Sequence, residues 1–213
     1  MNAYQLEIVS DFICPWCFVA ETRLQRAIAQ LQPTEDFQMI WQPFELNPNL
    51  PEPGIDRKIY RSQKFGSWAY SQQLDAQTIL ATQDDKIEFD YDRMAVTPNT
   101  LKAHRLTGFA AQQNLDTAMV ERILRAYFSE GQPIGEVEVL SNLAAEVGLD
   151  RGEVRAFLES DAGTQEVRNL ERQIATQGIR GVPSIRIGAN WLSGARSVAE
   201  YRTALQQMME VES

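Results

Sequence analysis

Two cysteines separated by two residues are the part of this sequence best suited to chemistry. Cys14 and Cys17 enclose Pro15 and Trp16, and the chain contains no other cysteine. Thiols three positions apart on one helical turn lie on the same side, within the short reach of a disulfide. Such a pair can exchange with a second disulfide, because one thiolate attacks a sulfur and the other thiol resolves the mixed disulfide.

The flanking segments place the pair between a strand and a helix. Residues 5–12 are mostly apolar and predict a strand, while apolar positions at three- and four-residue spacing predict a helix over 18–31. A thiol at a helix N-terminus lies among unpaired N–H groups at the positive end of the helix dipole. We therefore expect Cys14 to be the exposed, attacking thiolate with a lowered pKa, and Cys17 to be the deeper, resolving thiol.

The two enclosed residues refine this expectation. Pro15 suits the first turn of a helix, where its missing N–H would be unpaired anyway. Trp16 offers an apolar face to a substrate and adds no charge, so backbone dipoles rather than a side chain are expected to stabilise the thiolate. The predicted pKa depression at Cys14 is therefore moderate.

The pair has three alternatives to a role in thiol–disulfide exchange. A structural zinc site needs two more ligands, and the chain offers a single histidine and no second cysteine pair. A structural disulfide closing so short a loop would stabilise the fold little. Two inert buried thiols are the third alternative.

Composition narrows the class of protein. The chain has 213 residues, 44% of them hydrophobic, and a net charge of -9. It can form a sizeable core, but an acidic surface suits neither nucleic acid nor an anionic membrane. The first residues lack the pattern of a secretory signal, so we expect a cytoplasmic protein, in which a single C-x-x-C pair is typically redox-active.

The order of predicted elements indicates an α/β domain interrupted by a helical one. A second strand is expected at 37–42, and four prolines within 43–53 mark a linker. Strand patterns return at 183–187 and 191–192, followed by a helix over 197–209, and Ile87–Tyr91 reads as a short extended piece. We expect an α/β domain of residues 1–43 and 178–213 and an all-helical insertion of 44–177. Its helices are predicted at 56–64, 67–83, 98–113, 116–129, 136–147, 150–160 and from about 162 to Gly178.

A proline begins the strand near the C-terminus. Proline at the first position of a strand needs no functional explanation. A cis Val182–Pro183 bond beside the cysteines would instead turn a backbone edge outward, where Val182 could pair with an incoming peptide. Together with the cysteine pair, this arrangement predicts a substrate-binding edge at Val182 and Pro183.

These features resemble the thioredoxin-fold superfamily, specifically its DsbA-like members with a helical insertion. The resemblance rests on the segments 10–17, 178–187 and 192–195, and further segments at 41–48, 98–106 and 126–131 are similar to the FrnE-like branch. It implies a thioredoxin fold and a dithiol–disulfide oxidoreductase or isomerase. Its partners would be proteins, peptides or small molecules that carry thiols or disulfides, and it would need no cofactor.

Two alternative functions remain at this point. The branch is also similar to glutathione-dependent enzymes of the kappa transferase and 2-hydroxychromene-2-carboxylate isomerase type, which carry serine where Cys14 stands. The resemblance implies that glutathione could dock near Val182, Ser193 and Gly194. The second alternative is a non-catalytic module for redox sensing or chaperone-like binding.

Three polar residues are weaker candidates. His104, the only histidine, could face the cysteines and tune the thiolate or carry a proton, or it could be an ordinary packed helix residue. Asn99 is a candidate for substrate binding, although its place at a helix start is explained by capping alone. Asp11 could accept a thiol proton, but a surface or capping position is the expected one.

Aromatic and acidic residues complete the candidates. One or two aromatic side chains are expected to reach a groove between the domains, from the set Trp41, Phe44, Phe65 and Trp68. The acidic residues Asp84, Asp85, Asp90 and Asp92 are expected to form solvated turns rather than a metal site.

Overall fold

A four-stranded sheet joins the two ends of the chain. The computed structural model describes residues 4–31, 36–52 and 54–212, and its sheet has the order β2-β1-β5-β6. The central strand β1 (Tyr4–Ser10) runs parallel to β2 (Phe37–Pro43) and antiparallel to β5 (Ser184–Ile187), which pairs with β6 (Asn190–Ser193). The N-terminal strand is therefore held between segments from both ends of the sequence.

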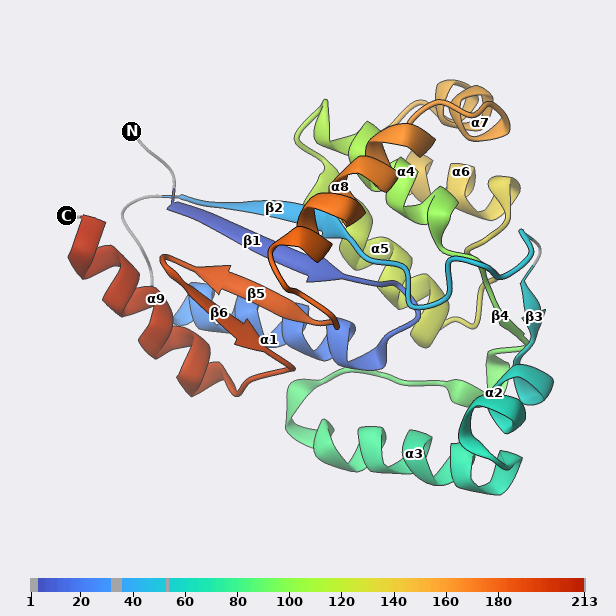
Figure 1. Ribbon diagram of the computed structural model, residues 1–213, viewed down its shortest axis with the longest axis horizontal. Coiled ribbons are helices and arrows are strands. Elements are labelled where there is room, and N and C mark those ends of the chain that lie inside the picture. The colour runs from blue at the N-terminus through green and yellow to red at the C-terminus, as the bar shows by residue number, and fades with distance from the viewer. Residues whose placement is uncertain (1–3, 32–35, 53, 213) are drawn as a thin grey trace.

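Helices cover both faces of this sheet (Figure 1). The helix α1 (Pro15–Leu31) packs against α9 (Val198–Glu212), and their apolar residues form one core with those of the sheet. The helices α5 (Asp116–Phe128) and α8 (Thr164–Thr176) contact β2. The strand–helix–strand unit predicted for the first forty residues is present, with the cysteine pair at its first junction.

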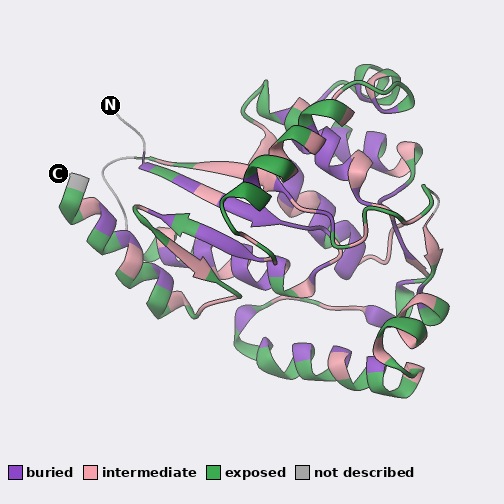
Figure 2. Cartoon of the chain, viewed as in Figure 1, coloured by how far each residue is buried: buried purple, intermediate pink, exposed green. Residues whose placement is uncertain are grey.

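The chain between β2 and β5 is mostly helical and has its own core. Figure 2 shows buried residues concentrated where these helices face one another and the sheet. A short antiparallel pair, β3 (Ile55–Asp56) with β4 (Val96–Thr97), also lies here and was not expected from the sequence. The remaining helices are α2 (Arg57–Phe65), α3 (Trp68–Ala81), α4 (Leu101–Ala111), α6 (Val137–Glu146) and α7 (Arg151–Glu159), with the 3₁₀ turns η1 (Gln83–Asp85) and η2 (Tyr91–Arg93).

Most predicted elements are present within a few residues of their expected bounds. The helix predicted from residue 98 begins only at Leu101, because Asn99 accepts the Leu101 N–H and closes a turn before it. Ile87–Tyr91 is irregular rather than extended and leads into η2. Domain boundaries at 43/44 and 177/178 remain a prediction. Among the described residues, no helix is both long and apolar enough to span a membrane.

Candidate active site at the Cys14–Cys17 turn

The two cysteines lie at the start of α1, after a short turn that follows β1. The Cys14 N–H donates to the Asp11 carbonyl oxygen at 3.2 Å, and the Cys17 N–H donates to the Cys14 carbonyl oxygen at 3.0 Å. Pro15 is the first helical residue, so Cys14 immediately precedes the helix. Both thiols are free and both are buried, with 7% of Cys14 and 2% of Cys17 exposed. The prediction of an exposed Cys14 is therefore wrong, because surrounding side chains cover it within a cavity.

The environments of the two sulfurs push their pKa values apart. A hydrogen bond from the Cys17 thiol lowers the pKa of Cys14, and the backbone N–H groups of Cys17 and Trp16 act in the same direction against burial. Burial raises the pKa of Cys17 well above its ordinary value. The order of the pKa values agrees with the predicted roles. However, a side chain, the neighbouring thiol, contributes more to the thiolate than the backbone dipoles that were expected to dominate.

A cis peptide bond lies beside the first cysteine. The Val182–Pro183 bond is cis, and the Cys14 thiol donates to the Val182 carbonyl oxygen at an Sγ–O distance of 3.9 Å. The Gly194 N–H donates to the Pro183 carbonyl oxygen at 2.8 Å, and Ser193 pairs with Ser184 across β5 and β6. The structure therefore brings Val182, Pro183 and Gly194 together next to Cys14.

A cavity of about 300 Å³ lies on the other side of Cys14, and we call it the Cys14 cavity. Cys14, Pro15 and Trp16 form one wall, and the helices α2 and α3 contribute most of the opposite wall. Trp16 is 38% exposed, as expected of a side chain that meets a substrate. Of the four aromatic candidates, Phe65 lines this cavity, whereas Phe44 and Trp68 do not.

A buried polar pair lies beneath the cysteines. Asp11 is only 1% exposed, so its expected surface position is wrong. Its N–H donates to Cys17 Sγ at 3.5 Å, and its Oδ2 accepts the Leu46 N–H at 2.7 Å. The other carboxylate oxygen, Oδ1, lies 3.5 Å from Nε2 of His104. His104 is therefore connected to the cysteine turn through Asp11.

His104 also faces a second, larger cavity. This space of about 700 Å³ lies along β2 and between α4 and α8, and it is lined by Ser10, His104 and Trp41 among others. Neither cysteine lines it, so its size does not make it the reactive cleft. The Trp41 Nε1–H donates to Thr117 Oγ1 at 3.1 Å, which fixes the indole against α5.

The remaining candidates have structural contacts. Asn99 lines neither cavity, and its side chain donates to the Leu50 carbonyl oxygen at 2.9 Å and accepts the Leu101 N–H. Asp85 is buried and paired with Arg23 and Arg26, so its prediction as a solvated residue is wrong. The two ion pairs offset part of the cost of removing its charge from water.

The basic face of α2 was missed at the level of sequence. Arg57, Arg61 and Lys64 recur at spacings of four and three residues, which places them on one side of the helix. Arg57 and Arg61 both bind Asp75 of α3 at 2.7 Å, and Arg61 and Lys64 line the Cys14 cavity. Their spacing was a usable signal, but nothing in the sequence indicated that this face lies opposite Cys14.

The described residues contain no cluster of three or more histidine, cysteine, aspartate or glutamate side chains that could hold a metal ion. The site itself contains two thiols with polar side chains around them. A buried thiol pair with separated pKa values, next to a cis-proline edge, can carry out thiol–disulfide exchange.

Known proteins with the same architecture span almost the whole chain. The chain is 29% identical to the uncharacterized protein YwbO of Bacillus subtilis over 205 residues, 94% of either chain. The crystal structure of the probable DsbA oxidoreductase SCO1869 from Streptomyces coelicolor superposes with a TM-score of 0.85 at 28% identity, covering 97% of this chain and 90% of that one. The cytosolic disulfide reductase DsbM from Pseudomonas aeruginosa has the same fold, with a TM-score of 0.71 at 18% identity and coverage of 97% and 99%.

A family model confirms the resemblance seen in the sequence. The model of the DSBA-like thioredoxin domain matches residues 5–206, which include both cysteines, the helical segment and the cis-proline. The chain belongs to the family of DSBA-like thioredoxin domains, and this membership supports the general function of a thiol–disulfide oxidoreductase.

Proposed function

We propose that Cys14 attacks a substrate disulfide and that Cys17 resolves the resulting mixed disulfide. The observation that carries this proposal is the opposite displacement of the two pKa values, lowered at Cys14 and raised at Cys17. The Cys14 thiolate forms a bond to one substrate sulfur, and the other sulfur leaves as a thiolate that takes up a proton. Cys17 then loses its proton, attacks Cys14 Sγ and releases the second thiol, so two electrons pass to the substrate.

The cis-proline edge is proposed to hold the substrate during this exchange. Val182 lies against Cys14, so an extended peptide pairing with its backbone would bring a neighbouring disulfide to the thiolate. Trp16 supports the same role, because its exposed ring offers an apolar contact at the mouth of the site. Proteins, peptides and small molecules with accessible disulfides or thiols are the proposed partners.

Asp11 and His104 are proposed to receive the proton of Cys17. Cys17 is buried, and a buried thiol needs a nearby polar route to lose its proton. Asp11 contacts Cys17 through its N–H and approaches His104 through its carboxylate, and His104 lines the second cavity. A His104→Gln variant should slow the second step and change its pH profile. An unchanged profile would assign His104 to packing alone.

The central test replaces each thiol separately. Cys14→Ser should abolish reduction of insulin disulfides, because the remaining thiol, Cys17, is buried and has a raised pKa. Cys17→Ser should accumulate mixed disulfides with substrate, which mass spectrometry of acid-quenched samples would detect. Circular dichroism checks that both variants are folded. Full activity of Cys14→Ser would overturn the proposal.

The direction of the reaction depends on the reduction potential of the pair. A redox titration against glutathione buffers, followed by thiol alkylation, would measure it. A strongly reducing value supports a reductase, and an oxidising value supports an oxidase or isomerase. A cytoplasmic location is also part of the proposal, supported by the cytosolic designation of DsbM.

A glutathione-dependent isomerase or transferase is the second candidate. Ser193 and Gly194 adjoin the cis-proline, and DsbM has been solved with glutathione, which supports a glutathione site along this edge. Calorimetry with reduced glutathione would test binding. Turnover that survives Cys17→Ser would favour this candidate, because addition chemistry needs no resolving thiol. A pair that is unreactive toward a thiol reagent in the folded protein would instead indicate a non-catalytic module.

A further inference from the structure

The Cys14 cavity has a distinctive balance of charge. Asp75 is bound by Arg57 and Arg61, each at 2.7 Å, so a single carboxylate faces two guanidinium groups. The Arg57 side chain is only 3% exposed, so solvent does little to offset the surplus charge. Arg61 and Asp75 line the cavity and Arg57 lies behind them, so these three side chains together carry one surplus positive charge beside the cavity, although the whole chain has a net charge of -9.

Lys64 adds a second positive charge to the same cavity. It follows Arg61 by one helical turn, and no carboxylate pairs with it in the part of the chain that the structure describes. Its ammonium donates to the Tyr60 hydroxyl at 2.9 Å and lies over the rings of Tyr60 and Phe65. These contacts hold the ammonium at the cavity without neutralising it.

The neighbouring polar groups also favour an acceptor ligand. The Tyr60 hydroxyl donates to Asn47 Oδ1, which leaves the Asn47 amide N–H₂ facing outward from that bond. Asn47 Nδ2 is buried and has no hydrogen-bond partner among the described residues. Both oxygens of Asp75 are already occupied by arginines. The cavity therefore offers unused donors but no free carboxylate.

We propose that the Cys14 cavity selects substrates that carry a carboxylate near the reacting sulfur. The inference rests on the proposed exchange at Cys14 and adds the substrate class. Lys64 binds the carboxylate, and Cys14 attacks the disulfide of the same molecule. The cavity volume of about 300 Å³ is at the small end for ligand sites, which suits a small acidic disulfide or one acidic residue beside a cysteine.

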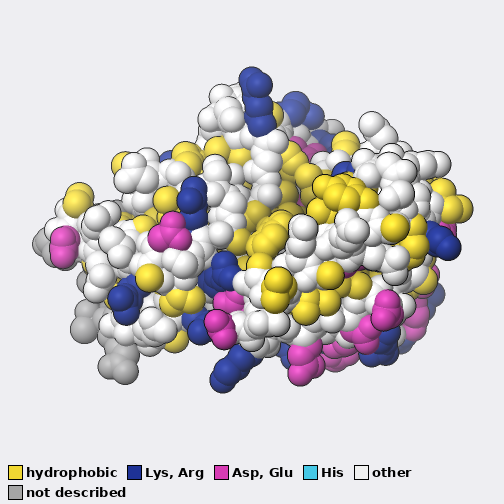
Figure 3. Space-filling view, turned by 90° about the horizontal axis from the view of Figure 1, so that it is seen from below, with side chains coloured by type: hydrophobic (Ala, Val, Ile, Leu, Met, Phe, Trp, Pro, Cys, Tyr) yellow, Lys and Arg dark blue, Asp and Glu magenta, His cyan; other side chains and the backbone are white. Residues whose placement is uncertain are grey.

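Figure 3 shows the α3 side of the molecule. Hydrophobic side chains gather on this face, and charged side chains lie around them. Exposed apolar residues on α2 and α3 include Ile59, Tyr70, Ile79 and Leu80. Within the cavity, the Lys64 ammonium lies among apolar side chains such as Trp16 and Phe65, where it offers a distinct anchor for an anionic group.

The experiment compares disulfides that differ in charge. The reduced protein is mixed with glutathione disulfide (anionic), bis(2-hydroxyethyl) disulfide (neutral) or cystamine (cationic), and alkylation of unreacted thiols gives the rate constants. We expect glutathione disulfide to react about tenfold faster than the neutral compound at low salt, and this preference to fall as salt is added.

Lys64→Gln isolates the contribution of the ammonium. It should slow the reaction with glutathione disulfide about five- to tenfold and leave the neutral disulfide unchanged. Lys58→Gln is the matched control, because Lys58 is an exposed lysine of the same helix that does not line the cavity. Lys64→Glu should favour cystamine over glutathione disulfide.

The outcomes separate this inference from the proposed function. Failure of all three disulfides to oxidise the pair would overturn the proposed exchange itself. Reaction with the neutral disulfide, but with equal rates for all three and no effect of Lys64→Gln, would overturn only the carboxylate selection.

A further comparison shows whether the carboxylate belongs to a polypeptide or to a small molecule. It uses a peptide disulfide flanked by glutamates and the same peptide with glutamines in their place. A preference for the glutamate peptide points to polypeptide substrates, and a preference confined to glutathione disulfide points to small ones.

Discussion

Two aspartates, one in the middle of α3 and one in the 3₁₀ turn that follows it, are each held by two arginines, yet the resulting clusters differ in their surroundings. Asp75 pairs with Arg57 and Arg61 beside the Cys14 cavity. Asp85, in the turn after α3, pairs with Arg23 at 2.6 Å and with Arg26 at 3.0 Å. The same set of groups is thus used twice within one part of the fold.

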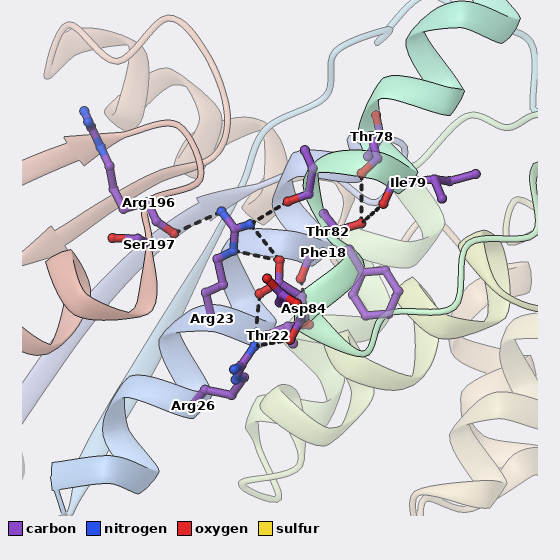
Figure 4. A network of polar contacts seen from close by, with 12 residues as sticks. Phe18, Thr22, Arg23, Arg26, Thr78, Ile79, Thr82, Asp84, Arg196 and Ser197 are labelled. Carbon is purple, nitrogen blue, oxygen red and sulfur yellow. Dashed lines mark hydrogen bonds and ion pairs between the residues drawn. The ribbon is translucent and has the colours of Figure 1, made fainter.

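The cluster around Asp85 fastens α3 to the rest of the molecule (Figure 4). Arg23 of α1 also donates to the carbonyl oxygens of Ala81, at 3.1 Å, and Arg196, at 3.4 Å. It thereby connects α1, the end of α3 and the turn before α9. Its spare N–H groups bind backbone acceptors, so the cluster works as a structural link.

In the cluster around Asp75, the charged groups of all three side chains are largely shielded from solvent. The Arg57 guanidinium lies over the rings of Trp68 and Tyr91, at 5.5 and 5.3 Å, instead of on backbone carbonyl groups. Arg61 binds Ser71 and Asp75. The contrast teaches that the same number of ion pairs can link three separate elements, as at Asp85, or join two neighbouring helices beside the reactive cavity, as at Asp75, where Arg61 also donates to the Ser71 carbonyl oxygen at 3.3 Å.

The largest expected effect comes from removing the carboxylate of each cluster. Asp75→Asn leaves the buried Arg57 without a counter-charge and should lower the free energy of unfolding by about 3–5 kcal/mol. Asp85→Asn should cost only about 1–2 kcal/mol, because Arg26 is 42% exposed and the backbone bonds of Arg23 remain. Urea denaturation followed by circular dichroism measures both values.

Asp84→Asn is the control for this comparison. Asp84 adjoins Asp85 in the chain but is exposed, and it makes no ion pair with another described residue. Its substitution should change the free energy of unfolding by less than about 0.5 kcal/mol. Equal losses for Asp75→Asn and Asp85→Asn would show that the two clusters are energetically the same.

The sequence was sufficient for features that depend on local pattern. The cysteine pair at a strand–helix junction and the later Val182–Pro183 segment led to the correct fold family and to a cis bond that the structure contains. Hydrophobic spacing located most helices and strands, because period and capping residues are encoded within a few positions.

The sequence was insufficient where side chains meet across long separations. The sequence predicts that Asp85 lies in a solvated acidic turn, because nothing local indicates that Arg23, 62 residues earlier, pairs with it in the fold. The sequence likewise predicts a surface position for Asp11, because its contacts with Leu46 and His104 form only in the folded chain. The two-residue strands β3 and β4 are too short to carry a periodic pattern, and they form because the chain around them brings their edges together.

Glu21, a buried carboxylate with no arginine ion pair among the described residues, extends the comparison. Burial, together with the charge of Glu121, raises the pKa of Glu21 to about 8. Between its ordinary value of 4.5 and about 8, the folded protein holds a proton that the unfolded chain has lost. Stability should therefore fall as the pH rises through this range and level off above it.

Glu21→Gln removes this pH dependence. Relative to the parent protein, its melting temperature should rise by roughly 4 °C or more between pH 5 and pH 8.5, measured by differential scanning fluorimetry. Glu88→Gln is the control, because Glu88 is exposed at the same surface hollow. Lys86, Arg26 and Arg125 also line this hollow, and melting curves that stay parallel would mean that they compensate the Glu21 charge.

The smallest expected effect concerns Asp11, a second buried carboxylate without an arginine partner among the described residues. Its negative charge raises the pKa of Cys14, in opposition to the hydrogen bond from Cys17 that lowers it. Asp11→Asn removes that charge and should lower the pKa of Cys14 further, by less than about one unit. The absorbance of the thiolate near 240 nm, measured against pH in a Cys17→Ser background, reports this shift.

Asp92→Asn serves as the matched control, since Asp92 is exposed and does not act on the Cys14 thiolate. A Cys14 pKa that rises in Asp11→Asn would mean that Asp11 supports the thiolate through the geometry of the turn rather than opposing it through charge. A pKa that falls would show that the Asp11 carboxylate and the hydrogen bond from residue 17 act on the Cys14 thiolate in opposite directions. The reactivity of Cys14 would then reflect the balance between a buried carboxylate beneath the turn and the hydrogen-bond donor one turn further along the helix.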